Sequence, residues 1–198
     1  FGCIIRIMTK KLVYVDFETG DLTPEDSEII TIQWQEVDAN TGDIMGDLKI
    51  YKRWEYSTDK EFIYDAVNGS KVEDDFGNSV NFLINKFPPK IGFNLFFEQN
   101  FLEKKLIEHN LPKFWKAQII GYDTMAVDLK HVAIIINEGN FKGSGLDNVS
   151  GKKTSGKDVP EWNRLGQYDK IVDYIVDETE AALEFYKKLL NYMKGYEI

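Results

Sequence analysis

The sequence predicts an α/β fold in which helices surround one mixed sheet. Three segments with strand patterning follow one another early in the chain, which predicts an antiparallel meander. Helical and strand-like segments then alternate toward the C-terminus. Hydrophobic residues make up 43% and aromatic residues 14% of the 198 residues, so the chain can bury a sizeable core. A chain of this length is expected to form a single domain.

The meander comes first in the chain. Residues 11–17 are mostly β-branched or aromatic, which predicts a buried strand. Residues 28–37 alternate apolar and polar side chains, as a strand with one covered face does. Turn-forming residues at 38–43 lead into a third strand over residues 44–54. We expect these three strands to pair antiparallel.

Helices and short strands follow the meander. We expect helices over residues 57–67, 76–87, 97–109, 127–137 and 165–194, and short strands over residues 90–94 and 117–123. Pro88 and Pro89 should end the second helix, because proline lacks the amide that a helix interior needs, and Gly195 should end the last. Residues 139–160 are rich in Gly, Ser, Lys and Asp, which predicts a loop with at most one helical turn.

Charge and composition exclude several classes of protein. The chain carries 33 acidic and 24 basic residues, a net charge of −9, which argues against coating duplex DNA by bulk charge. Nucleic acid would have to bind through a local basic surface or through metal ions. Cys3 is the single cysteine, which excludes a disulfide scaffold, fits a reducing compartment and predicts a cytoplasmic location. Two histidines argue against a histidine-rich zinc site.

The first residues do not resemble a targeting segment. Residues 1–7 are too short an apolar stretch for a secretory signal, and no run of eighteen apolar residues predicts a membrane span. Met8 and the residues after it resemble a natural start. We therefore expect residues 1–7 to be an addition upstream of the natural protein, with an extra edge strand as the alternative.

Two carboxylates lie near the end of the first predicted strand. Asp16 and Glu18 belong to the sequence VDFETG. Side chains alternate along a strand, so both carboxylates share one face, and Phe17 points to the other. Adjacent carboxylates are costly unless a cation lies between them, and Mg²⁺ or Mn²⁺ suits oxygen ligands. Taken alone, the pattern also fits two solvated acids at a strand end.

A third candidate carboxylate is Glu98. A short predicted strand ends at Asn94, and Glu98 lies in the first turn of the helix that follows. The helix dipole stabilises a carboxylate there, so Glu98 alone would be an ordinary N-terminal acid. The neighbouring Phe97, Phe101 and Leu102 alone suggest a core face.

A fourth candidate lies in the last helix. At about 100° per residue, the apolar residues of this helix form one stripe, with Glu178 inside it and Asp177 toward water. Tyr174 lies one turn before Glu178, so the two side chains are neighbours. A glutamate in an apolar stripe needs a partner, and a metal ion is a natural one. The alternative is a glutamate at the stripe edge that reaches water or a lysine.

In this order, the acidic motifs resemble those of the DEDD 3′–5′ exonuclease superfamily. VDFETG (15–20) is similar to its first motif, NLFFEQNFL (94–102) to its second, and YIVDE (174–178) to the third motif of its tyrosine subtype. Residues 127–137 and 143–153 are similar to its middle segment. The resemblance implies a ribonuclease H-like mixed sheet, with residues 8–198 forming one exonuclease-like domain.

Two positions depart from the family pattern, because Glu98 and Glu178 stand where the family has aspartate. Glutamate keeps the charge but reaches one methylene further, so the ligand geometry must be rebuilt. An alternative register uses Asp177 and leaves Tyr174 one residue too close; we prefer Glu178 because the helical stripe buries it. The histidine subtype needs a histidine five residues before the acid, and neither His109 nor His131 stands there.

The resemblance implies a mechanism with two divalent ions, Mg²⁺ or Mn²⁺, about 4 Å apart at the scissile phosphate. It assigns Asp16 to both ions. It assigns Glu18 and Glu178 to one ion and Glu98 to the other through water. Tyr174 would orient the attacking water. The implied substrate is the 3′ end of single-stranded DNA or RNA, and the implied products are nucleoside monophosphates.

Other residues are candidates for substrate binding. Phe17 and Phe97 could stack on the terminal base or sugar, with core packing as the favoured alternative for both. Thr19 and Asn94 belong to the first two motifs and are assigned to substrate binding with them. The basic loop 142–157 includes Lys152 and Lys153, which we expect to contact the phosphate backbone unless the loop is simply solvated.

The favoured function is therefore a metal-dependent 3′–5′ exonuclease for single-stranded DNA or RNA. The main alternative is a non-catalytic exonuclease-like module that binds nucleic acid or a protein, and the two glutamate departures favour it. A ribonuclease H-type endonuclease or resolvase shares the fold, but Tyr174 and the Asn94–Glu98 pattern favour the exonuclease branch.

Overall fold

The main sheet of the protein has five strands. The computed structural model describes residues 11–25, 27–73, 77–121, 125–150 and 155–194. The strands of the main sheet are β1 (Lys11–Thr19), β2 (Ile29–Asp38), β3 (Ile44–Lys52), β6 (Lys90–Gly92) and β7 (Ala126–Asp128). A second, two-stranded sheet pairs β4 (Lys71–Glu73) with β5 (Ser79–Asn81).

The main sheet is mixed, in the order β3-β2-β1-β6-β7. Neighbours within β1, β2 and β3 run antiparallel, whereas β6 runs parallel to β1 and β7 parallel to β6. The antiparallel meander and the mixed α/β class predicted from the sequence are therefore confirmed. The third strand ends at Lys52, two residues earlier than expected, because a 3-10 turn, η1 (Arg53–Glu55), follows it.

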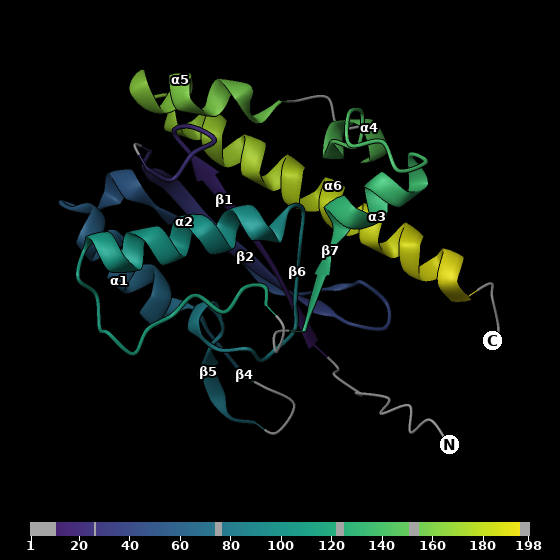
Figure 1. The fold of residues 1–198 in the computed structure, drawn as a ribbon, viewed down its shortest axis with the longest axis horizontal. Coiled ribbons are helices and arrows are strands. Elements are labelled where there is room, and N and C mark those ends of the chain that lie inside the picture. Colours follow the sequence, from purple (N-terminus) through teal and green to yellow (C-terminus); the bar gives the residue numbers. More distant parts are fainter. Residues whose placement is uncertain (1–10, 26, 74–76, 122–124, 151–154, 195–198) are drawn as a thin grey trace.

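Helices flank the sheet (Figure 1). They are α1 (Asp59–Gly69), α2 (Leu95–Glu108), α3 (Leu129–Ile136), α4 (Leu146–Ser150), α5 (Val159–Arg164) and α6 (Tyr168–Lys194), with 3-10 turns η2 (Phe82–Ile84) and η3 (Gly156–Asp158). The hydroxyl of Thr58 accepts from the amide of Glu61 and so caps α1. Helix α6 runs diagonally across the molecule, and its buried residues form one apolar stripe along it.

Alternation along β1 separates two hydrophobic layers. Val13, Val15 and Phe17 pack with buried residues of α1 and α2. Leu12 and Tyr14 point to the opposite face, where α3, α4 and α6 pack. Asp16 and Glu18 share the parity of Tyr14, so the strand directs them to the face that α6 covers.

Two predicted elements are wrong. Residues 76–87 do not form a helix: in the described part, β5 and η2 occupy this stretch, and the amide of Phe82 donates to the carbonyl of Ser70. The predicted strand 117–123 is also absent over residues 117–120, and Gly121 forms an isolated bridge. Side chains of α2 take its backbone groups instead: Gln99 accepts from the amide of Ile119 at 2.8 Å, and Glu103 accepts from that of Ala117 at 2.9 Å. β7 takes the edge position of the sheet.

The loop expected over residues 139–160 is partly helical, because it contains α4 and the beginning of η3–α5. Residues 1–7 and Gly195 lie outside the described residues. Within the described segments, no helix combines the length and the apolar run that a bilayer crossing requires.

Candidate metal centre

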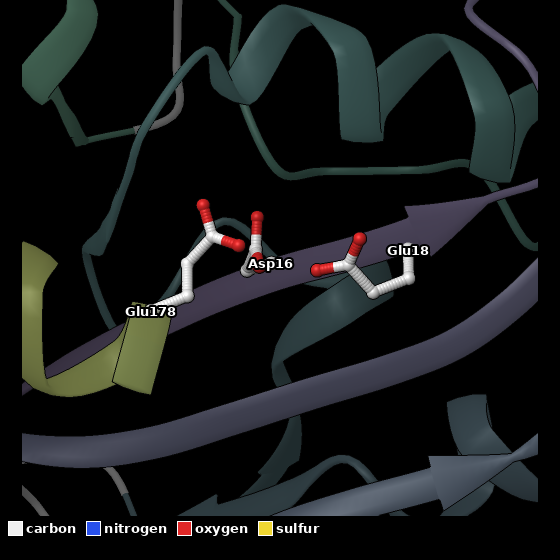
Figure 2. Close-up of side chains that lie close together, drawn as sticks. All are labelled: Asp16, Glu18 and Glu178. Carbon is white, nitrogen blue, oxygen red and sulfur yellow. The ribbon is translucent and has the colours of Figure 1, made fainter. Parts of the chain in front are cut away.

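Three carboxylates converge where β1 ends beneath α6. Asp16 and Glu18 come from β1, and Glu178 comes from α6. One carboxylate oxygen from each lies within 4.8 Å of the other two. Figure 2 shows the three side chains pointing toward one another. Asp16 and Glu18 are buried, and Glu178 is half-buried.

Helix α6 delivers Glu178, and Asp177 does not join the group. Tyr174, Ile175 and Ala182 are buried on the face of α6 that covers the sheet. Glu178 lies one turn from Tyr174 on that face, whereas Asp177 is exposed. The structure thus places Glu178, and not the alternative Asp177, beside Asp16.

A polar chain on the neighbouring strand fixes Asp16. Gln33 lies opposite Asp16 in the β1–β2 register, and its side-chain amide donates to Asp16 Oδ2 at 2.8 Å. The hydroxyl of Thr31 donates to Gln33 Oε1 at 2.9 Å and orients that amide. Because Thr31 and Gln33 are fully buried, Asp16 has one well-defined position.

Glu98 approaches the same region from the first turn of α2. It is only 2% exposed, and its Oε2 atom has no hydrogen-bond partner in the described part of the protein. Burial raises the pKa of Glu98 well above its ordinary value, and the negative charges of Asp16, Asp128 and Glu178 add to that rise. Glu98 is not part of the 4.8 Å group. A buried, unpaired carboxylate oxygen beside other carboxylates is a site that a cation would satisfy.

Tyr174 lies against the carboxylates. Its side chain is 5% exposed and donates a hydrogen bond to Glu178. Burial, then the charges of Glu18 and Glu178, raise the pKa of Tyr174, so the hydroxyl keeps its proton. Gly156 lets η3 pass close to Tyr174, because a Cβ at position 156 would lie 2.7 Å from the Tyr174 hydroxyl. The segment around Gly156 therefore forms a wall of the site.

Asp128 is a positioning residue that the sequence analysis missed. Its Oδ1 accepts from the amides of Asn94 and Lys130 at 2.9 Å each, and its Oδ2 accepts from the amide of Leu95 at 3.1 Å. The carboxylate thus joins the start of α3 to the start of α2, which carries Glu98. Asp128 directly precedes an apolar helical segment, which predicts that it caps α3, but nothing in the sequence indicates its bonds to α2.

Tyr14 is the second residue that sequence reasoning missed. It is fully buried on the carboxylate face of β1, and its hydroxyl has no hydrogen-bond partner among the described residues. Burial raises its pKa, and the charges of Asp16, Glu178, Glu18 and Glu98 raise it further. The two-residue step from Tyr14 to Asp16 could have revealed this position, because it puts both on one strand face.

The candidate substrate residues have different surroundings. Phe17 is buried in the hydrophobic layer under α1 and α2, on the face of β1 opposite the carboxylates, which is the core packing favoured from the sequence. Phe97 is half-buried, with its ring centroid 4.6 Å from that of Phe101. Thr19 is half-buried and donates to the carbonyl of Asp21.

Asn94 is exposed at the start of α2 and has a left-handed backbone, with φ of 75°, a conformation that asparagine tolerates better than most residues. It leaves the amides at the start of α2 facing Asp128. Lys152 and Lys153 lie outside the described residues.

The donors present fit a hard divalent cation. Asp16, Glu18, Glu98 and Glu178 offer carboxylate oxygens, the ligands that Mg²⁺ and Mn²⁺ prefer. One of these oxygens, on Glu98, is buried and unsatisfied. These carboxylates therefore fit a cation site. Without a cation, their mutual repulsion would destabilise the folded protein.

Comparisons with known proteins support the fold. No protein-family model matches the chain, and no curated protein matches its sequence. Solved structures of exonuclease I are similar to it. A zinc-bound complex of Escherichia coli exonuclease I with single-stranded DNA has a TM-score of 0.52 and 12% identity, over 90% of this chain and 40% of that chain.

Two further structures agree with the first. E. coli exonuclease I with a 5cy-dA13 oligonucleotide has a TM-score of 0.54 and 10% identity, over 94% of this chain and 43% of that one. The complex of exonuclease I with SSB-Ct has a TM-score of 0.54 and 11% identity, over the same shares, 94% and 43%. The chain thus spans about two fifths of the proteins it matches. The protein has an exonuclease-like fold.

Proposed function

We propose that the protein is a metal-dependent 3′–5′ exonuclease that hydrolyses the phosphodiester bonds of single-stranded DNA or RNA. The observation that carries this proposal is the convergence of Asp16, Glu18 and Glu178 within 4.8 Å, on a strand and a helix far apart in sequence. The exonuclease-like fold supports the same function.

The carboxylates would hold a pair of Mg²⁺ or Mn²⁺ ions. Asp16, fixed by Gln33, would bind both; Glu18 and Glu178 would complete one, and Glu98 would contribute to the other. When bound, such ions make water nucleophilic near neutral pH and stabilise the charge that develops on the phosphate. Among the described residues, Asp16, Glu18 and Glu178 are the one set of three possible metal ligands that lie this close together.

Tyr174 would position the attacking water. Its hydroxyl donates to Glu178, and Gly156 lies close to it on the other chain segment. The oxygen of that water bonds to the terminal phosphorus while the bond from phosphorus to the 3′ oxygen breaks. A nucleoside 5′-monophosphate leaves, and the shortened strand ends in a new 3′ hydroxyl that has taken up a proton. The placement of Tyr174 beside Glu178 supports the tyrosine subtype.

The neighbouring acids of α6 provide a matched test. Glu178→Gln removes the charge of a proposed ligand, and Asp177→Asn makes the same change one residue away on the exposed side. A 5′-labelled single strand is digested with Mn²⁺ or with chelator, and a strand with a blocked 3′ end serves as the substrate control. We expect Mn²⁺-dependent shortening from the 3′ end by the parent and Asp177→Asn. We expect a loss of at least about 100-fold in Glu178→Gln.

The outcomes separate the candidate functions. Equal digestion by Glu178→Gln and the parent would remove Glu178 from the site. Binding of the strand by the parent without any digestion would instead favour a non-catalytic module, in which the departures at Glu98 and Glu178 have disabled the chemistry. Internal cleavage of the blocked strand would indicate an endonuclease.

A further inference from the structure

An aromatic pair with a lysine between its rings lies outside the carboxylate group. Lys130 Nζ is 5.4 Å from the ring centroid of Phe93 and 4.4 Å from that of Phe141. The same ammonium donates to the carbonyl of Ser144 at 2.6 Å, which fixes its position. The ring of Phe141 is 71% exposed, so one of its faces remains open to a ligand.

The strand register places this group next to the carboxylates. Strands β1 and β6 are parallel, with Tyr14 opposite Ile91. Extending this register by two residues sets Phe93 beside Asp16 on the same face, on strands about 4.8 Å apart. Phe93 packs against the cluster that contains Tyr14 and Ile91, as this register requires. Phe93, Lys130 and Phe141 therefore form a row that starts at Asp16.

Asp128 fixes the row relative to the site. Lys130 lies in the first turn of α3, and its amide donates to Asp128. Asp128 also binds the amide of Asn94, the residue that follows Phe93. The same carboxylate thus binds the start of α3, the end of β6 and the start of the helix that carries Glu98. Figure 1 shows these three elements, α3, β6 and α2.

The chemistry of the row suits single-stranded nucleic acid. Aromatic rings stack on bases of any type, and a lysine beside them pairs with the phosphate. Within the described residues, Lys130 forms no ion pair with a carboxylate. Because the protein carries a net charge of −9, it must bind a polyanion through such local features.

We propose that Phe93, Lys130 and Phe141 bind the nucleotides on the 5′ side of the scissile phosphate and do so without base preference. This inference rests on the proposed function. An exonuclease that removes terminal nucleotides holds only one nucleotide beyond the bond it breaks. A row that leads away from the carboxylates therefore holds the remainder of the strand. Continuity with the site and the unpaired lysine favour nucleic acid over a protein segment or a second copy of the chain.

Two substrates of different length test the row. The p-nitrophenyl ester of thymidine 5′-monophosphate needs only the carboxylate site, whereas single-stranded oligothymidylate also needs the row. The variants are Phe141→Ala and Lys130→Met, and the measured quantity is the ratio of kcat/KM for the oligonucleotide to kcat/KM for the ester. We expect this ratio to fall about tenfold in each variant. The salt dependence of oligonucleotide binding should be shallower in Lys130→Met.

Two control variants match the tests. Phe114→Ala removes a ring that is 82% exposed, on the loop after α2 and so about 20 Å along that helix from Asn94. Lys60→Met removes an exposed charge on α1, under the opposite face of the sheet. Both should keep the ratio of the parent. Phe141→Ala changes an exposed side chain, so its folding should be intact.

Binding measurements keep the inference separate from the proposed function. Fluorescence anisotropy with a labelled oligothymidylate reports affinity without turnover, and Phe141→Ala and Lys130→Met should bind about tenfold more weakly. If the parent hydrolyses neither substrate but the variants still bind the strand more weakly, the proposed function fails and the row stands. Parent-like ratios and affinities in both variants would overturn the row. A change in oligomeric mass of Phe141→Ala with parent-like strand affinity would also overturn it, in favour of self-association.

Discussion

Single side chains decide what the carboxylate site can do, and Tyr174 is the first of them. Tyr174→Phe keeps the ring and its packing against Trp162, with ring centroids 6.2 Å apart, but removes the hydroxyl that donates to Glu178. An orienting hydroxyl contributes about 10² to 10⁴ in rate. Under single-turnover conditions with saturating enzyme, we expect digestion of a 3′-labelled strand to slow by that factor, with Mn²⁺ and strand affinity near those of the parent.

Equal single-turnover rates for Tyr174→Phe and the parent would leave Tyr174 with a packing role only. Tyr168→Phe is a suitable control, because Tyr168 stacks on Trp54 at 4.3 Å near the start of α6 and is not part of the candidate site.

The hydroxyl of Tyr14 is expected to destabilise the folded protein. It is buried without a partner, so it has lost its hydrogen bonds to water and gained none from the protein. Tyr14→Phe should therefore raise the free energy of unfolding of the metal-free protein by about 1 kcal/mol. Urea denaturation in chelator measures this change. A loss of stability in that experiment would show that the hydroxyl has a partner in solution.

At the scale of elements, Asp128 couples two helix starts. Asp128→Ala would leave the amides of Asn94, Leu95 and Lys130 without their acceptor. Charged caps and buried bonds of this kind are worth about 2 to 4 kcal/mol together, so we expect that loss in urea denaturation. Because α2 carries Glu98, Mn²⁺ should also bind more weakly to this variant.

The cap of α1 provides the comparison for Asp128. Thr58→Ala removes the bond to the amide of Glu61 and should cost about 1 kcal/mol. It should leave Mn²⁺ affinity at the level of the parent, since α1 contributes no carboxylate to the site. Equal effects of the two variants on Mn²⁺ affinity would contradict the positioning role of Asp128.

At the scale of the whole molecule, the proposed cation binding should stabilise the folded state. Asp16, Glu18 and Glu178 repel one another when they lie within 4.8 Å, and a bound cation removes that repulsion. MnCl₂ should therefore raise the thermal midpoint in a concentration-dependent way. The rise should be smaller in Glu178→Gln and unchanged in Asp177→Asn, and a rise of the same size in all three proteins would indicate binding elsewhere.

A buried lysine sets a second property of the whole molecule. Lys90 on β6 is fully buried, its ammonium donates to the carbonyl of Asn85, and burial lowers its pKa from 10.5 to about 7. Between these two pH values the unfolded chain binds a proton that the folded protein has released, so the stability contributed by this group rises with pH. Urea denaturation at pH 7 to 10 should show this rise relative to Lys90→Met, by at most about 1.4 kcal/mol per pH unit. Parallel pH profiles would contradict it.

The sequence by itself determined the parts of this protein that depend on local spacing. Alternation along β1 put Asp16 and Glu18 on one face, and the 3.6-residue period of α6 turned Glu178 inward and Asp177 outward. The meander followed from strand patterning and turn residues for the same reason.

Only the tertiary structure decided the features that depend on contacts between distant segments. The side chains of Gln99 and Glu103 accept from the amides of Ala117, Ile119 and Ile120, so residues 117–120 do not form the strand that their composition predicts. The bonds from Asp128 to α2 and the row from Phe93 to Phe141 arise because parallel pairing sets β6 between β1 and β7. The hydrophobic periodicity of the sequence does not predict such pairings, because the partners are tens of residues apart and the packing of the whole sheet determines them.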